Sequence, residues 1–214
     1  MNREMYLYPL IFVLSFTLSC ATTEKERYLS ELSPTENAYL KVTTVKINAN
    51  HKIAGGRLGL LPLNCNKPRV GNVIGDTIGH NLLDSSLLVV ERTYLVKIIE
   101  EQGISLTGLT ENIDYSRIGK VSNVDYILVG TVTMVDRPYS WGFGYGFKKE
   151  SSYTECSGAA ARIVDVVTGE VVMSVVYNTT LVELKWQRPT QIGEALATAI
   201  KYGLWKQDQP ELIQ

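Results

Sequence analysis

Two apolar segments in the middle of the chain have the pattern of β-strands. They are Tyr126–Val135 and Ala160–Val167, and the second runs into the turn signal Thr168-Gly169. Because the side chains of a strand point to opposite faces with a period of two, dense segments of this kind indicate strands packed in a core. Another apolar segment, residues 170–182, follows the turn, where glycine supplies the positive φ. It is predicted to pair back on the strand before it.

Between the first two strands lies a segment, residues 139–147, in which every second residue is aromatic. A serine or a glycine occupies the positions between the rings. An extended segment of this kind has one aromatic face, which must pack on the body, on a partner or in lipid. We therefore predict a long hairpin with residues 137–153 as its tip. Its predicted membrane or partner contacts are Tyr139, Trp141, Phe143, Tyr145 and Phe147.

Shorter patterns predict the remaining elements. Apolar residues predict strands at residues 39–47, 57–63 and 87–92. Helical spacing predicts helices at residues 73–86, 94–102, 115–120 and 191–205, with a loop at 65–72 and Thr93 as an N-cap. The order of these elements predicts an α+β fold: a mainly antiparallel sheet with helices packed on one side, plus a long protruding β-hairpin.

The N-terminus has the features of an export signal. Tyr6–Leu18 is almost wholly apolar, is shorter than the about 20 residues of a membrane-crossing helix, and fits a signal-peptide core. Leu18-Ser19-Cys20 resembles a bacterial lipoprotein processing site, although Thr17 departs from it. An ordinary signal peptide is the alternative. We predict a signal peptide at residues 1–19, a tether at 20–37 lipidated on Cys20, and a periplasmic domain at 38–206.

Net charge, residue spacing and the motifs present argue against several classes of function. The net charge of −1 gives no electrostatic reason to bind nucleic acid. Neither His51 nor His80 has a second ligand at metal-binding spacing, so no metal site is predicted. No nucleophile elbow, phosphate-binding loop or zinc-protease motif occurs. We therefore predict a non-enzymatic protein without a cofactor or a small-molecule substrate.

Besides Cys20, the chain has two cysteines. In an oxidising periplasm Cys65 and Cys156 could form a disulfide. The alternative is a pair of free thiols, buried or at the rim of the core. Spacing alone does not decide between these two hypotheses.

Five blocks of sequence, in this order between Arg57 and Trp205, resemble the curli-secretion (CsgG/HfaB) family of outer-membrane lipoproteins. The blocks are Leu60–Leu63, Val89–Arg92, Ile98–Gln102, Val124–Val132 and Arg162–Val172. The resemblance implies a lipid anchor at the periplasmic face of the outer membrane and an α/β domain that forms a ring. It also implies a role in curli assembly, transport or secretion, with a homo-oligomer or an envelope protein as partner.

The sequence departs from the channel members of that family at two places. Those members contribute two hairpins per subunit to a shared transmembrane barrel, and the first lies where residues 137–153 lie here. Residues 183–189 leave no room for the second hairpin. The loop at 65–72 is also much shorter than the family's pore-constricting loop, so no gate residue is carried over.

Two functions and three roles for the hairpin tip therefore stay open. The protein is either a component of an oligomeric secretion or assembly apparatus, or a monomeric tethered adaptor or activator that binds a cell-wall or envelope partner. The aromatic tip either folds back on the domain, enters a bilayer or binds a protein. The polar return segment Ser151–Ser157 argues against the bilayer.

Overall fold

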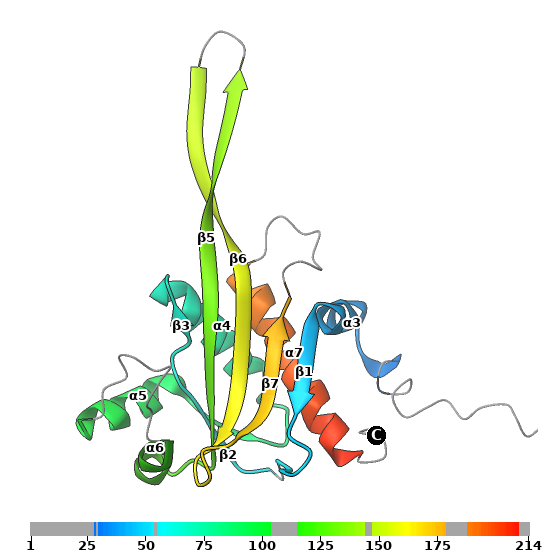
Figure 1. Cartoon of the computed structure of the whole chain (residues 1–214), viewed down its shortest axis with the longest axis vertical. Coiled ribbons are helices and arrows are strands. Elements are labelled where there is room, and N and C mark those ends of the chain that lie inside the picture. The colour runs from blue at the N-terminus through cyan, green and yellow to red at the C-terminus, as the bar shows by residue number, and fades with distance from the viewer. Residues whose placement is uncertain are drawn as a thin grey trace, which may run out of the picture. The chain divides into compact units, whose positions relative to one another are not determined.

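The computed structural model describes residues 28, 30–53, 55–103, 115–143, 147–178 and 188–209. The chain forms two compact units, residues 1–37 and 38–214. The strands, labelled in Figure 1, are β1 (Thr43–Ile47), β2 (Arg57–Leu60), β3 (Asn64–Cys65), β4 (Leu88–Val90), β5 (Tyr126–Phe143), β6 (Phe147–Asp165) and β7 (Val171–Tyr177). The helices are α3 (Pro34–Lys41), α4 (Pro68–Asn81), α5 (Arg92–Glu101), α6 (Tyr115–Ser122) and α7 (Pro189–Asp208).

The strands form one mixed sheet in the order β1-β7-β6-β5-β2-β4, and β3 also pairs with β5. The pairs β1–β7, β7–β6 and β6–β5 are antiparallel, whereas β5–β2, β2–β4 and β5–β3 are parallel. The prediction of a mainly antiparallel sheet is therefore wrong. Parallel strands are joined by crossover helices and are covered on both faces, which explains why residues 57–63 are apolar without alternation.

The helices lie on both faces of the sheet rather than on one. Leu128 packs with residues of α4 and α7, whereas Ile127, which points to the opposite face, packs with residues of α5 and α6. The chain crosses from β2 to β4 through α4 and returns to β5 through α5 and α6. Right-handed crossovers in opposite directions place their helices on opposite faces. The predicted single helical layer is wrong for this reason.

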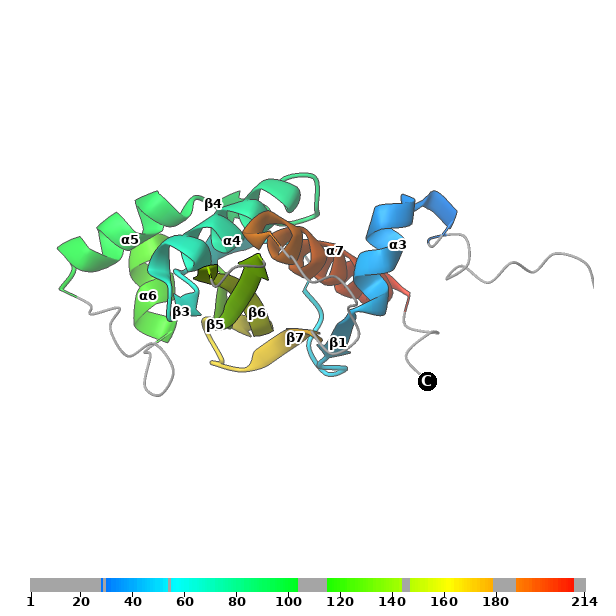
Figure 2. The ribbon, with the colours of Figure 1, turned by 90° about the horizontal axis from the view of Figure 1, so that it is seen from above.

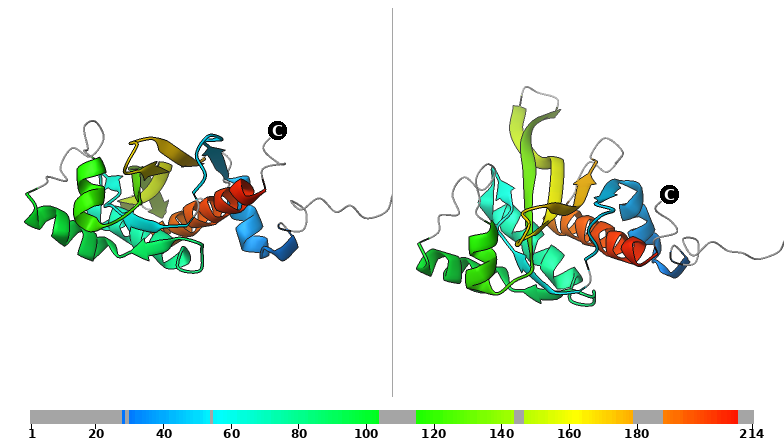
Figure 3. Two further views of the ribbon diagram at one scale, coloured as in Figure 1. Left: turned by 90° about the horizontal axis from the view of Figure 1, so that it is seen from below. Right: turned by 60° about the horizontal axis from the view of Figure 1, so that its bottom comes forward.

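The two helical layers do not cover the sheet equally. α7 runs along β1, β7 and β6 (Figure 2), and α5 and α6 are grouped at the end of the sheet that holds β2 (Figure 3). On the face of β1, β7 and β6 opposite α7, the side chains of Thr44, Lys46, Arg162 and Val176 are exposed. In the described part of the chain this is an open sheet face, and Figure 1 shows it toward the viewer.

Two helices begin at prolines that the sequence analysis did not assign to helix starts. α4 begins at Pro68, inside the predicted loop, because proline is favoured in the first turn of a helix, where its missing N–H has no partner to lose. α3 begins at Pro34, so that β1 starts only at Thr43. In front of α3, the Glu36 N–H donates to Ser33 Oγ and the Ser33 N–H donates to Glu36 Oε2, which is a capping box.

A third helix start is also displaced. α5 begins at Arg92 after Glu91, so Thr93 lies inside the helix and is not its N-cap. Arg92 donates from Nε and Nη2 to the carboxylate of Asp76 on α4, at 2.9 and 3.1 Å. This bidentate pair joins the start of α5 to the middle of α4, the helix that precedes β4 in the sequence.

The turn between β6 and β7 is closed by the carboxylate of Asp165. Its Oδ1 accepts hydrogen bonds from the Val167 and Thr168 N–H groups, both at 2.8 Å, and its Oδ2 lies 3.1 Å from His51 Nε2. Burial alone would raise the pKa of Asp165, but these hydrogen bonds and His51 outweigh it and lower the pKa below its usual value. Gly169 has φ +74°, which confirms the predicted glycine turn.

Candidate functional site

The long pairing of β5 with β6 is the first candidate feature. The two strands pair from Tyr126 opposite Asp165 to Phe143 opposite Phe147. β3 pairs with β5 only as far as Val132, and β7 pairs with β6 only from Ala159 onward. Beyond these positions, in the described part of the chain, β5 and β6 pair only with each other, and Figure 1 shows them rising away from the other strands.

The base of this ladder is held by the segment between β3 and α4. Asn66 Nδ2 donates to the Met134 carbonyl oxygen at 2.6 Å, and Asn66 Oδ1 accepts the Met134 N–H at 3.0 Å. Lys67 Nζ lies 2.6 Å from Asp136 Oδ1. The ladder is irregular here, because its register shifts between Thr133 and Met134. Asn66 therefore acts as a strand partner where the regular neighbours of β5 end.

The predicted contact residues lie at the far end of the ladder. The backbone of Tyr139, Trp141 and Phe143 pairs with that of Ser151, Lys149 and Phe147. Tyr145, the side chains of the other aromatic residues and Cys20 lie outside the described residues. The hairpin tip as a contact surface and the lipid on Cys20 therefore stay predictions.

The two other cysteines are buried in the same core cluster and are not bonded to each other in the structure. Cys65 lies beside Val132 on one side of β5, and Cys156 lies beside Met134 on the other side. Two strand spacings of about 4.8 Å each separate such positions, whereas a disulfide needs Cα atoms within about 7 Å. Burial raises the pKa of the Cys156 thiol, so it is protonated at neutral pH. The disulfide stays a prediction, which this topology disfavours.

The second candidate feature is a cleft on the open sheet face, beside the end of β2. Its volume is about 250 Å³. Its floor comes from β5 and β6, and its walls come from the segment after β2 and from the first residue of α6. The lining residues are Pro62, Asn64, Tyr115, Val129, Gly130, Thr131, Ala160 and Arg162.

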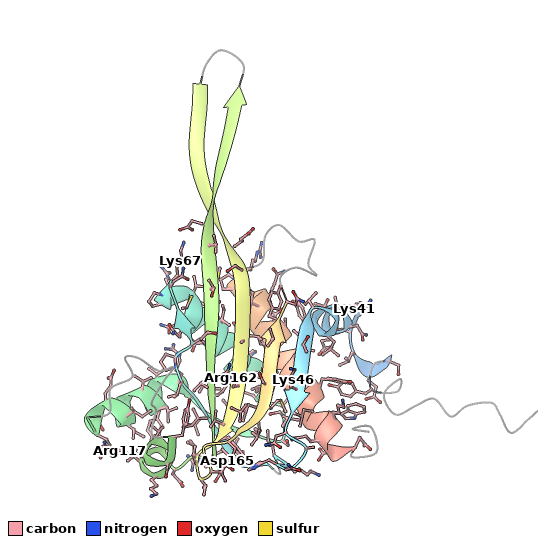
Figure 4. The ribbon with its side chains drawn as sticks, viewed as in Figure 1. Lys41, Lys46, Lys67, Arg117, Arg162 and Asp165 are labelled. Atoms are coloured by element: carbon pink, nitrogen blue, oxygen red, sulfur yellow. The ribbon has the colours of Figure 1, made fainter. Side chains whose placement is uncertain are left out.

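Arg162 differs from three basic residues elsewhere in the domain. Lys67, Arg92 and Lys201 each pair with an aspartate. The cross-strand neighbours of Arg162 are Val129 and Ser174, and within the described residues its side chain takes part in no ion pair or hydrogen bond. Figure 4 shows Arg162 on β6 and Lys46 on β1, on the same open face. The face therefore carries positive charge without an acidic neighbour beside Arg162.

The sequence alone does not indicate the hydrogen bonds from Asn66 to Met134 or the cleft. The sequence predicts a loop at residues 65–72 and gives Asn66 no role, although an asparagine after a strand is a common hydrogen-bonding residue. It predicts only a strand for Arg162, although this is the one charged residue in the otherwise apolar Ala160–Val164. A charge in such a strand indicates a side chain on an open face. Among the residues that the structure describes, no group of three or more His, Cys, Asp and Glu side chains could hold a metal ion.

The central part of the chain matches one protein family. The family model "Curli production assembly/transport component CsgG" matches residues 58–193, which is more than half of the chain. The chain therefore belongs to the CsgG family. No match was found among curated proteins. No helix in the described ranges has the length and the hydropathy that crossing a membrane requires.

Several solved structures resemble the chain at low sequence identity. The PelC dodecamer from Paraburkholderia phytofirmans is 14% identical, with a TM-score of 0.37 over 73% of this chain and 96% of that one. The lipoprotein GNA1162 from Neisseria meningitidis is 13% identical, with a TM-score of 0.41 over 60% and 85%. The LpoB C-terminal domain from Salmonella enterica is 14% identical, with a TM-score of 0.40 over 68% and 94%. We draw no functional conclusion from these likenesses.

Proposed function

We propose that this protein is a non-enzymatic lipoprotein of the bacterial envelope and a component of a secretion or assembly apparatus. In this proposal a lipid on Cys20 holds it at the periplasmic face of the outer membrane, and residues 20–37 form the tether. The tip of the β5–β6 ladder, residues 137–153, contacts a neighbouring copy, an envelope protein or the membrane.

The observation that carries the proposal is family membership over residues 58–193, because that range includes both strands of the long ladder. A two-stranded ribbon is marginally stable alone in water. The alternating aromatic residues at 139–147 add apolar surface that needs a partner. A homo-oligomer would supply that partner from the chain itself.

The experiment that tests the assembly role uses the lipidated protein purified in detergent. Its mass by light scattering and its conductance in liposomes are measured together. A mass of several subunits supports the oligomeric assembly role. Conductance in addition would show that the oligomer forms a channel. A monomer without conductance contradicts the oligomeric assembly role.

A monomeric adaptor or activator for a cell-wall or envelope partner is the second candidate function. One observation favours it: only residues 178–188 connect β7 to α7, which is too short for the second hairpin of the channel members. The mass measurement separates the two functions. The adaptor function also requires that a crosslinker placed on the hairpin tip of the monomer captures an envelope protein.

The role of the tip is tested by replacing Trp141, Phe143 and Tyr145 with serine. The matched control replaces Ser140, Ser151 and Ser152 with alanine, which changes the same region without removing rings. We expect only the aromatic replacement to abolish oligomers, partner crosslinks or membrane insertion. Unchanged behaviour of both variants would mean that the tip has no contact role.

The lipid anchor has its own test. We expect the Cys20→Ser variant to be recovered in the soluble periplasmic fraction, whereas the wild type fractionates with outer membranes. Continued fractionation of Cys20→Ser with membranes would contradict a lipid anchor. A thiol change at Cys65→Ser serves as the control, because Cys65 is buried in the core.

A further inference from the structure

The cleft lies at a position in the topology where open α/β sheets bind ligands. The chain leaves the end of β2 toward β4 on one side, and β5 lies on the other side of β2. Ligands of such sheets bind outside the carboxyl ends of parallel strands, where the crossovers diverge. Pro62 and Asn64 follow the carboxyl end of β2, and both line the cleft. Topology and cavity therefore point to the same place.

The floor of the cleft lets a flat ligand approach the backbone closely. It contains Ala160, whose side chain is a single methyl group, and the backbone of Gly130, whose Cα–Cβ direction points to Leu63 in the core on the other face of the sheet. The two strands are paired with each other through this region, so the floor offers no strand edge to which a peptide could add. A ligand here is bound by side chains rather than by a β-ladder.

The walls provide three kinds of contact. Tyr115 provides an aromatic side chain, half-buried at the start of α6, and Asn64 and Thr131 provide an amide and a hydroxyl. Arg162 provides an exposed guanidinium, which can hold a carboxylate with two parallel hydrogen bonds. A volume of about 250 Å³ lies just below the range of small-molecule sites, roughly 300–1,000 Å³, so the cleft suits one ring.

We propose that this cleft binds a saccharide ring that carries a carboxylate, such as a uronic acid unit. The aromatic ring of Tyr115 packs on the C–H face of the sugar, Asn64 and Thr131 hydrogen-bond its hydroxyls, and Arg162 pairs with its carboxylate. Lys46 lies on the same face, two strands from Arg162, and extends the positive charge for a longer acidic glycan. The saccharide is a bound ligand and not a substrate, and its binding does not depend on the oligomeric role proposed above.

The test compares two probes that differ only at one group: methyl β-glucuronide, which has the carboxylate, and methyl β-glucoside, which has a hydroxymethyl group. Their binding to the full processed chain is measured by nuclear magnetic resonance titration and calorimetry. We expect the glucuronide to bind at least about tenfold more tightly, since a charge-assisted pair with arginine is worth that or more. The affinity should also fall as salt is added.

The variant Arg162→Gln should lose about this same tenfold for the glucuronide and leave glucoside binding unchanged. The matched control is Lys120→Gln, which removes one positive charge from an exposed position of α6 outside the cleft lining. It should bind the glucuronide like the wild type. Thermal unfolding of both variants should match that of the wild type, because Arg162 is exposed and makes no ion pair in the described structure.

Four outcomes would overturn the proposal. Equal affinity for the two glycosides would show that the cleft does not recognise the carboxylate. An equal loss in Lys120→Gln and Arg162→Gln indicates general charge attraction. A short acidic peptide that binds more tightly than the glucuronide makes the cleft a peptide site. Absence of binding of either glycoside at tens of millimolar shows that the cleft has no such ligand.

Discussion

Asn66 holds the backbone of Met134 through both of its amide atoms, with Nδ2 to the carbonyl oxygen at 2.6 Å and Oδ1 from the N–H at 3.0 Å. Met134 is a core residue with 4% of its surface exposed. A single side chain therefore satisfies both polar groups of a buried backbone position at the register shift of β5. Backbone groups at such positions otherwise lose their partners.

The variant Asn66→Ala should destabilise the domain by about 1–3 kcal/mol, because it leaves buried backbone groups without partners. Urea unfolding measures this free energy, and hydrogen exchange should show faster exchange of the Met134 amide. Asn50→Ala, at an exposed position of a loop, is the matched control and should unfold like the wild type. Unchanged exchange at Met134 in Asn66→Ala would contradict the role given to Asn66.

Gly130 should not tolerate even a methyl group. A Cβ there would meet the Ala160 carbonyl oxygen of the neighbouring strand and Leu63 Cδ2 at 2.9 Å. Because a paired backbone cannot move aside easily, Gly130→Ala should lower the free energy of unfolding by about 1–3 kcal/mol. Gly158→Ala, on the same strand pair, has nothing within 4 Å of its Cβ and should be close to neutral. Equal free energies of unfolding for the two variants would show that the ladder relaxes around Gly130.

Asp165 should make stability depend on pH in the acidic range. Its folded pKa lies below the ordinary 3.8, so its contribution is fully present above that pH and is lost as the pH falls through the lower folded value. Asp165→Ala should therefore cost about 1–3 kcal/mol near pH 7, and the difference from the wild type should narrow below about pH 3.8. Unfolding free energies from pH 7 to pH 2.5 measure this.

The control for Asp165 is Asp84→Ala. Asp84 also has a lowered pKa, caused first by its hydrogen bond from Lys201, but its side chain is 73% exposed. Surface ion pairs contribute about 0–1 kcal/mol, so its loss should be small at every pH. A pH-independent cost of Asp165→Ala would mean that its shape, and not its charge, closes the turn.

Cys65 and Cys156 should both be free thiols in the protein isolated without reductant. Alkylation under denaturing conditions followed by mass spectrometry counts them directly. We expect two alkyl groups on a chain whose Cys20 is replaced by serine, because β5 separates the two positions. A chain that gains alkyl groups only after reduction would establish the disulfide and require β3 to lie closer to β6.

The sequence predicted the elements of the fold better than their arrangement. Tyr126–Val135 and Ala160–Val167 are dense in apolar residues because both of their faces are packed: Leu128 and Ile163 belong to the core with α4 and α7, and Ile127 and Val166 belong to the core with α5 and α6. Whether Leu58 and Leu60 belong to a parallel or an antiparallel strand depends on which strand they meet, and their apolar character fits both. The helix starts at Pro34 and Pro68 were missed because proline both ends and begins helices.

The candidate site was predictable only in part. The alternating aromatics at residues 139–147 are local and visible in the sequence, so the tip was found. The cleft needs Asn64, Tyr115, Thr131 and Arg162, which come from four separate elements and meet only through the sheet order. The bond from Asn66 to Met134 joins residues that are far apart in sequence, and no local pattern marks it.

The ladder of β5 and β6 has a mechanical consequence. The two strands that carry the tip also form the floor of the cleft, with no loop between the two regions. A pull or tilt applied to the tip would travel down a paired ribbon, which is stiff along its length, to Val129 and Ala160. Met134 is held by Asn66 and lies at the register shift, so the outer part of the ribbon would bend relative to the sheet at this residue. Load on the outer end and occupancy of the cleft would then influence each other.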